Sequence, residues 1–395
     1  MSLKRFTNAK NLRGLGKPLL TEFFDRFKTE LAAKSVTLPA VTMKDDAYFT
    51  ALAKMFLSPT ELPDEMVEVL YAVVEMADDS GQERLQLAVK EKGLTLETDD
   101  DTSHMDYAMR VWLADKELLM AKHGEHRLVR IASFQYFGTR MPVGSRMKFV
   151  PPTPAVLDLA RDEIDKWCAE NNRGSETARV RMQELDGEWW FAIQHGGTVK
   201  RESKVDKRKV QTLHFRPGQD AVVVYNPERD DIRIHAGSNG ERKLYQAEFG
   251  QRLRSDPGYF SDRKNFVLDP LRNDLKKALS VEGLPDIKSI VLQEVEYWFG
   301  GDYDDRLVRK SDDIVASAAQ RSKEDMVIPP VKDSGLLVSA TFEIEFAKSS
   351  KPRKVQVRPP DQLKVGRHGD VKAVHEWLTL REFRAVTTPT TAGGA

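Results

Sequence analysis

The chain has 395 residues, more than one compact core usually holds, and this length predicts two or three domains. Its 40% hydrophobic and 31% charged residues are typical of a globular protein and exclude the disordered and membrane classes. The 61 basic and 61 acidic residues give a net charge of zero, which excludes a bulk attraction to polyanions. The single cysteine, Cys168, excludes an internal disulfide and any metal site built from paired thiolates.

The N-terminal stretch MSLKRFTNAKNLRGLGK is basic but lacks the apolar segment and the cleavage site of a secretory signal. No apolar run in the sequence approaches the ~18 residues of a membrane-spanning helix. We therefore expect a cytoplasmic protein that makes no membrane contact.

Residues 1–124 place apolar side chains at the 3.6-residue spacing of amphipathic helices. Phe23, Phe27 and Leu31, for example, fall on one stripe, and 62–77 is apolar on most sides, which indicates a central helix. The predicted helices cover residues 18–31, 46–57, 62–77, 82–93 and 103–122. This pattern predicts an all-helical bundle domain over residues 1–124.

From about residue 126 the pattern changes to the two-residue alternation of β-strands. The predicted strands are 126–137, 178–185, 188–195, 209–215, 221–226, 231–236, 289–299, 336–347 and 353–359. Helices are predicted at 154–172, 241–253, 312–320 and 370–383. The fold class is therefore α+β: an N-terminal all-helical bundle, then a larger, mainly antiparallel β domain with flanking helices. We expect that second domain, with its β-meander, to span 125–386, and 387–395 to be a disordered tail.

The charge is unevenly distributed along the chain. Residues 1–124 carry 16 Lys and Arg against 21 Asp and Glu, a net charge of −5, which leaves +5 for the remainder. Within the first part, residues 58–82 contain seven acids and no base. Such segments are candidate contacts for protein partners, although most charge runs simply face solvent.

The stretch HGGTVKRESKVDKRK, residues 195–209, combines two glycines with a run of positive charge. A phosphate cradle would need glycines that lead directly into a helix N-terminus, whereas strands are predicted on both sides here. We therefore predict a hairpin loop. It is either a solvated turn or a contact to the phosphates of a polyanion.

A second basic segment, residues 348–367, has seven bases against one acid and strengthens the polyanion hypothesis. Neither segment has the interleaved aromatic residues of single-strand binders, so we expect contacts to phosphates of DNA or RNA rather than to bases. The candidate nucleic-acid-binding residues are Lys200, Arg201, Lys204, Lys207, Arg208, Lys209, Lys351, Arg353, Lys354 and Arg358.

A metal-dependent nuclease would need carboxylates on adjacent strands near a lysine. The nearest candidates are Glu343, Glu345 and Lys348, accompanied by the acidic strand 289–299. The acids alternate with apolar residues as in any half-buried strand, and the E-x-K triplet of restriction-type nucleases is absent from this strand. The nuclease is therefore an alternative hypothesis.

His195, His214 and His235 lie near the ends of predicted strands, but alternation places His195 on the core face and His235, with Arg233, toward solvent. In 97–106, Ser103 and Asp106 predict a capping box rather than a cation site. We expect no metal and no cofactor.

Three function classes fit the sequence. The first is a non-enzymatic accessory or adaptor subunit that contacts nucleic-acid phosphates through basic loops and other protein subunits through the acidic helical domain. A bacterial multi-protein system, for example one of anti-phage defence, would suit such a subunit. The second class is the divergent nuclease. The third is a small-molecule or peptide sensor with a pocket near Trp189, Trp190 and Trp298. Cys168 is expected to be buried and inert, because no nucleophile motif surrounds it.

Overall fold

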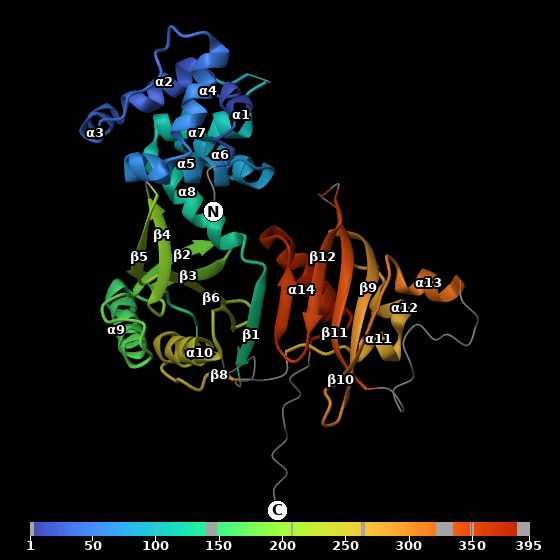
Figure 1. The fold of residues 1–395 in the computed structure, drawn as a ribbon. Coiled ribbons are helices and arrows are strands. Elements are labelled where there is room, and N and C mark those ends of the chain that lie inside the picture. Colours follow the sequence, from blue (N-terminus) through green and yellow to red (C-terminus); the bar gives the residue numbers. More distant parts are fainter. Residues whose placement is uncertain are drawn as a thin grey trace, which may run out of the picture. The chain divides into compact units, whose positions relative to one another are not determined.

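The computed structural model describes residues 4–99, 101–139, 148–206, 208–261, 265–320, 335–347, 349 and 351–384. The chain divides into two compact units, Met1–Val129 and Arg130–Ala395. The first is helical and the second is built on a large antiparallel sheet with helices, so the predicted α+β class is confirmed (Figure 1). No helix in the described ranges combines the length and the apolar character needed to cross a membrane.

The helical unit begins and ends its helices at the residues that capping chemistry favours. Asp78 accepts a hydrogen bond from Gly81 N at the start of one helix, and that helix ends at Gly93 in the left-handed conformation, as its sequence predicts. The helices are α1 Ala9–Arg13, α2 Lys17–Asp25, α3 Lys28–Ala33, α4 Asp45–Met55, η1 Pro59–Glu61, α5 Asp64–Glu75, α6 Asp79–Lys92, α7 His104–Ala114 and α8 Lys116–Val129.

Two helices that the sequence predicts as continuous are broken. The predicted helix 103–122 divides at Asp115, whose backbone is extended and whose carboxylate accepts a hydrogen bond from Leu118 N at 2.9 Å, so this residue caps α8. The predicted helix 18–31 divides at Phe27, which is buried against the ring of Trp112 at a centroid distance of 5.6 Å. The first break is capped by Asp115, and at the second the ring of Phe27 stacks on Trp112.

In the second unit, the strands form a sheet with the order β10-β9-β11-β12-β13-β1-β7-β6-β3-β2, and β8 pairs with β1. A separate pair of strands, β4 and β5, lies outside this sheet. The strands are β1 Ser133–Thr139, β2 Arg179–Leu185, β3 Glu188–Gly196, β4 Lys200–Asp206, β5 Lys209–Phe215, β6 Gly218–Asn226, β7 Asp231–His235, β8 Phe260–Ser261, β9 Ile287–Gly300, β10 Asp305–Lys310, β11 Leu336–Phe346, β12 Arg353–Arg358 and β13 Gln362–Val365.

Helices cover opposite faces of the two halves of this sheet. Phe137 and Phe191 pack on one face with α9 and α10, in a core that includes Tyr245. The neighbouring Tyr136 points the other way and meets α14, while Trp377 of α14 packs on Phe342 of β11. The helices are α9 Pro154–Glu170, α10 Asn239–Arg254, α11 Pro270–Asn273, α12 Leu275–Ala278, α13 Ile314–Gln320, η3 His368–Asp370 and α14 Val371–Leu380 (Figure 1).

The predicted strand 126–137 is wrong over its first seven residues. Helix α8 continues to Val129, because His126 and Val129 fall on its buried side, and β1 starts only at Ser133. The short strands β10 and β13 have no counterpart among the predicted elements, since their sequences are mostly charged or polar on the exposed side.

Candidate nucleic-acid interface

The basic stretch that the sequence predicts as a loop is a β-strand, which corrects the prediction. Strand β4 pairs with β5 from Lys200 opposite Phe215 to Val205 opposite Val210, and neither strand pairs with the main sheet. Arg208 in the turn has a left-handed φ of 66°. We call this two-stranded element the β4–β5 ribbon. Lys207, one of the candidate contacts, lies outside the described residues.

The cations of the β4–β5 ribbon face solvent. None of those with described side chains takes part in an ion pair, and the strand residues 208–214 are all exposed. Val205 and Val210, paired near the tip, are 69% and 72% exposed. A lone two-stranded ribbon is marginal in water. The ribbon therefore presents both unneutralised charge and uncovered apolar surface. The exposed cations are Lys200, Arg201, Lys204, Arg208 and Lys209.

The two glycines of the HGG stretch, Gly196 and Gly197, lie at the root of the ribbon, where β3 leads into β4 and β5 leads into β6. A Cβ atom at Gly196 would lie 2.5 Å from both Arg173 O and Arg216 Cδ, so no side chain fits there. Gly197 N donates to Pro217 O at 2.7 Å, and Arg216 Nη1 donates to Gly197 O at 2.6 Å. These hydrogen bonds join the two ends of the ribbon to each other at this root.

A cleft of about 500 Å³ opens beside this root. Arg216 and the exposed Val199 line it from the ribbon side, and the loop after α9 lines it from the other side. The cleft and the ribbon together form one continuous candidate surface. Its other lining residues are Ala169, Asn172, Gly174, Ser175 and Thr198.

The side chains of the second basic segment, residues 348–367, do not share one face of the sheet. Arg353 points toward α14, where its Nη1 donates to Asp370 Oδ2 at 2.6 Å and its guanidinium lies 5.8 Å from the Phe346 ring centroid. Lys354 and Arg358 alternate with it and lie on the opposite face of the sheet. Arg353 is therefore ion-paired within the second unit. Lys351 is exposed in the preceding turn, and Lys348 lies outside the described residues.

The face that carries Lys354 and Arg358 is charge-balanced. Arg358 pairs with Glu296 at 3.2 Å, and Lys354 lies directly opposite Glu343 across the β11–β12 pair. Further ion pairs on this face are Lys288–Glu345 at 3.1 Å, Arg306–Glu296 at 2.8 Å and Lys310–Glu294 at 3.5 Å. The strands β7, β1 and β13 separate β6, at the ribbon root, from β12. The two basic segments therefore do not form one continuous basic track.

The carboxylates of the nuclease hypothesis lie within this charge-balanced face. Glu343 and Glu345 project from alternate positions of β11, and Glu345 is bound to Lys288. Over the described ranges, no three His, Cys, Asp or Glu side chains gather closely enough to hold a metal ion. Glu345 pairs with Lys288, and Glu343 lies opposite Lys354 across the β11–β12 pair.

The histidines lie in unrelated surroundings. His195 is buried on the core face, as alternation predicts, with its Nε2 3.4 Å from Glu241 Oε1. Burial opposes the charged form of this ring, but hydrogen bonds to Cys168, Glu241 and the Gly196 carbonyl raise the pKa of His195 to about 10. Cys168 is buried, as predicted. His214 belongs to the β4–β5 ribbon.

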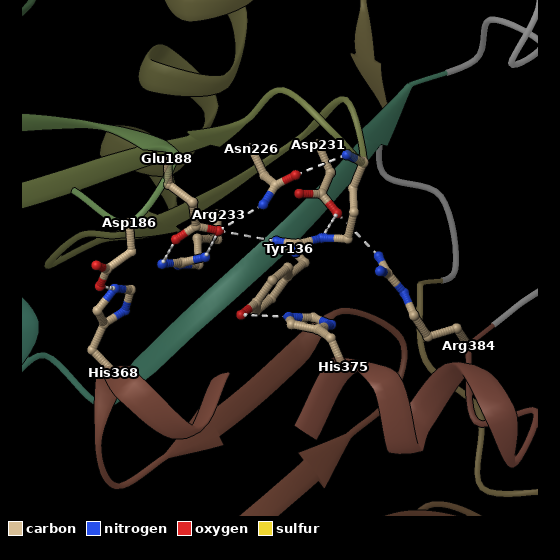
Figure 2. Close-up of polar contacts among 10 residues, drawn as sticks. Tyr136, Asp186, Glu188, Asn226, Asp231, Arg233, His368, His375 and Arg384 are labelled. Carbon is tan, nitrogen blue, oxygen red and sulfur yellow. Dashed lines mark hydrogen bonds and ion pairs between the residues drawn. The ribbon is translucent and has the colours of Figure 1, made fainter. Parts of the chain in front are cut away.

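The prediction that Arg233 faces solvent beside His235 is wrong, because Arg233 is only 2% exposed. It belongs to a cluster of polar side chains that interact with one another (Figure 2). Its Nη1 and Nη2 donate to the two carboxylate oxygens of Glu188 at 2.8 and 2.6 Å. Its guanidinium carbon lies 5.2 Å from the Phe134 ring and 5.1 Å from the Trp190 ring. We call this group, with the residues bonded to it, the buried polar cluster.

The buried polar cluster ties β3, β6 and β7 to the C-terminal segment. Arg229 bridges Glu188 at 3.2 Å and Asp231 at 3.0 Å, and Arg384 donates to Asp231 at 3.1 Å. Burial alone would raise the pKa of Glu188, but the charge of Arg233 and its hydrogen bonds lower it to about 2. Asn226 donates to Glu188 at 2.9 Å, and His368 lies 3.1 Å from Asp186.

On the α14 side of this cluster, His375 Nε2 lies 3.2 Å from the Tyr136 hydroxyl (Figure 2). Burial, with the charges of Arg229, Arg384 and Arg233, holds the pKa of His375 well below its ordinary value of 6.5. The cavity beside Tyr136 has a volume of only about 10 Å³, the space of one water molecule. The cluster is thus an internal tie with no room for a substrate.

The tryptophans of the sensor hypothesis do not share a pocket wall. Trp190 is buried beside Arg233, and its neighbour Trp189 points to the opposite face of β3. Trp298 lies on β9, and six strands separate β9 from β3 in the sheet order.

The acidic segment 58–82 of the helical unit covers η1 and α5, where Glu61 and Glu68 are exposed. Five of its acids have basic partners. Asp64 pairs with Lys34 at 3.4 Å, and Glu65 pairs with Lys116. The carboxylates of Glu75, Asp78 and Asp79 lie 2.5, 3.6 and 3.8 Å from ring nitrogens of His123, His126 and His104. Ser103 caps α7 as predicted, but the Asp106 carboxylate bonds Arg110 instead of completing the capping box.

Comparison with protein-family models and with curated protein sequences finds none that matches this chain.

Proposed function

We propose that this protein is a non-enzymatic accessory subunit that holds nucleic acid through the phosphate contacts of its β4–β5 ribbon. The observation that carries the proposal is a projecting two-stranded ribbon whose five described Lys and Arg side chains have no ion-pair partners. Cations that are not neutralised within the protein release counterions when they meet a phosphate backbone, and this release is the main source of sequence-independent affinity.

The contrast within the chain supports this assignment. The second basic segment has a similar run of Lys and Arg in the sequence, but Arg353 is used by Asp370 and Arg358 by Glu296. The ribbon cations have no such partners among the described residues. The ribbon is therefore the stronger polyanion contact, although the two segments look equivalent in the sequence.

The test compares two variants with the same change of net charge. In the first, Lys200, Lys204, Arg208 and Lys209 become Ser. In the matched control, Lys351, Lys354, Arg358 and Lys364 become Ser. Binding of a fluorescent 20-bp duplex is measured by anisotropy between ~50 and ~300 mM salt. We expect the slope of log affinity against log salt to become shallower by ~0.9 for each phosphate that the first variant no longer neutralises, and to stay unchanged in the control.

Absence of salt-dependent binding by the wild-type protein at ~50 mM salt would overturn the proposal, because low salt favours phosphate contacts. Equal weakening in both variants would also overturn it, since this would show that net charge and not the ribbon determines the affinity. Circular dichroism of both variants checks that the substitutions leave the protein folded.

The helical unit supplies the adaptor part of the proposal. Glu61 and Glu68 are exposed beside the ion-paired Asp64 and Glu65, and Leu57 nearby is 66% exposed. Exposed acidic side chains favour a partner that presents basic residues. Replacing Glu61 and Glu68 with Lys is expected to release a partner that co-purifies with the wild-type protein from its native cells. If this variant retains every co-purifying partner, the proposal that the helical unit binds protein partners is wrong.

A further inference from the structure

The register of the β4–β5 ribbon divides its side chains into two unlike faces. Residues directly opposite each other in an antiparallel pair point to the same side. Arg201 lies opposite His214, Ser203 opposite Thr212, and Val205 opposite Val210, so these six share one face, which contains no carboxylate. We call it the acid-free face. The other face contains Glu202, together with Lys200, Lys204, Lys209, Gln211, Leu213 and Phe215.

We propose that the acid-free face docks into the major groove of a B-form DNA duplex, while the lysines of the other face reach the phosphates on either side. This inference rests on the proposed function and adds to it the ligand, the groove and the orientation. The B-DNA major groove is ~12 Å wide and admits a two-stranded ribbon. Two paired strands lie ~4.8 Å apart, and with the side chains on their outer edges their combined width matches that of the groove.

The acid-free face also has the chemistry that a groove floor accepts. Valine methyl groups pack on the thymine methyl group, and Ser or Thr hydroxyls donate to or accept from base edges. Here Val205 and Val210 stand at the tip, and Ser203 and Thr212 follow toward the root. Docking would cover the two valines, whose exposure has no other explanation in the described structure.

The opposite orientation is disfavoured by charge. With the other face inward, Glu202 would enter a groove lined by phosphates, and a like-charge juxtaposition of this kind costs several kcal/mol. With the acid-free face inward, Glu202 stays in solvent, and the long side chains of Lys200 and Lys204 extend sideways to the backbone. Duplex RNA is a poorer ligand because its major groove is deep and narrow.

The deciding experiment uses two adjacent positions of β5 that are both exposed and lie on opposite faces. Thr212→Glu and Gln211→Glu change the net charge equally, so long-range electrostatics cannot separate them. For a 20-bp DNA duplex at ~100 mM salt, we expect Thr212→Glu to weaken binding at least about tenfold more than Gln211→Glu. Thr212→Gln, which adds bulk without charge, controls for damage to the ribbon and is expected to bind within about threefold of the wild-type protein.

Each outcome bears on a different statement. Equal weakening by the two Glu variants, or greater weakening by Gln211→Glu, overturns the face assignment while leaving nucleic-acid binding intact. Loss of binding by Thr212→Gln, comparable to that of Thr212→Glu, overturns the electrostatic reason given for the orientation. An RNA duplex of the same sequence that binds as tightly as DNA overturns groove docking and leaves phosphate contact alone. If the wild-type protein binds no duplex, the proposed function itself fails.

Discussion

Glu188 and Arg233 form a two-fold hydrogen-bonded ion pair in the interior of the second unit, with exposed fractions of 6% and 2%. The pair joins the start of β3 to the middle of β7, and the rings of Phe134 and Trp190 enclose the guanidinium. Because charges so placed have lost most of their hydration, each partner is tolerated only while the other is present.

Glu188→Gln is therefore expected to lower the free energy of unfolding by ~3–5 kcal/mol, since it leaves the charge of Arg233 buried without its main counterion. Urea denaturation followed by tryptophan fluorescence measures the change. The exposed Glu184→Gln, on neighbouring β2, is the control. The double variant Glu188→Gln/Arg233→Met should recover part of the stability, and a decrease below ~1 kcal/mol in the single variant would contradict the assignment.

Acid should weaken the second unit through the same carboxylate. The pKa of Glu188 falls from 4.5 to about 2 on folding, so its contribution is complete above pH 4.5 and is lost as the pH drops from there toward 2. The contribution amounts to about 3 kcal/mol. The unfolding free energy of the wild-type protein should thus decline more steeply over this range than that of Glu188→Gln. Parallel curves would show that Glu188 titrates normally.

His375 should give a second pH dependence at milder acidity. In the folded protein the pKa of His375 lies well below 6.5. Below pH 6.5 the unfolded chain therefore binds a proton that the folded chain does not, and the free energy of unfolding decreases as the pH is lowered. The slope reaches at most ~1.4 kcal/mol per pH unit for one proton. We expect His375→Gln to have a flatter profile than the wild-type protein between pH 6.5 and 5, measured by urea midpoints. An unchanged slope would assign the effect to other groups.

Removing the β4–β5 ribbon should separate binding from folding. Its described side chains are exposed except for the half-buried Phe215, and none belongs to the core. Replacing residues 200–215 with a short Gly-Ser linker should therefore change the unfolding free energy by under ~1 kcal/mol. Duplex binding should be abolished in the same variant. A decrease in stability above ~2 kcal/mol would show that the ribbon packs on the rest of the unit.

The acids of β11 should prove dispensable for folding. Glu343→Gln/Glu345→Gln removes two partly exposed carboxylates and frees Lys288, so we expect stability to change by under ~1 kcal/mol and low-salt DNA binding to strengthen. We expect no Mg²⁺-dependent cleavage by the wild-type protein. Robust cleavage that disappears in the double variant would restore the nuclease hypothesis.

Part of the candidate interface is visible in the sequence and part is not. The run KRESKVDKRK marks a cationic segment, but its charged character suggested a loop. The pairing of β4 with β5, from Lys200 opposite Phe215 to Val205 opposite Val210, makes it a ribbon. Arg353 and Lys354 are adjacent and alike in the sequence. Their roles differ because alternation turns one toward Asp370 and the other toward a face with its own acids.

The sequence by itself determined the type of most elements and the α+β class, because periodicity and capping act within a few residues. It also determined which side of β7 enters the core through Ile232 and Ile234. What covers Arg233 on the other side was decided by the tertiary structure alone. Glu188 lies on β3 and His375 on α14. Both are far from Arg233 in the sequence, and no local sequence pattern indicates that such residues will meet. Burial of both faces of a strand depends on contacts made only when the whole sheet has assembled.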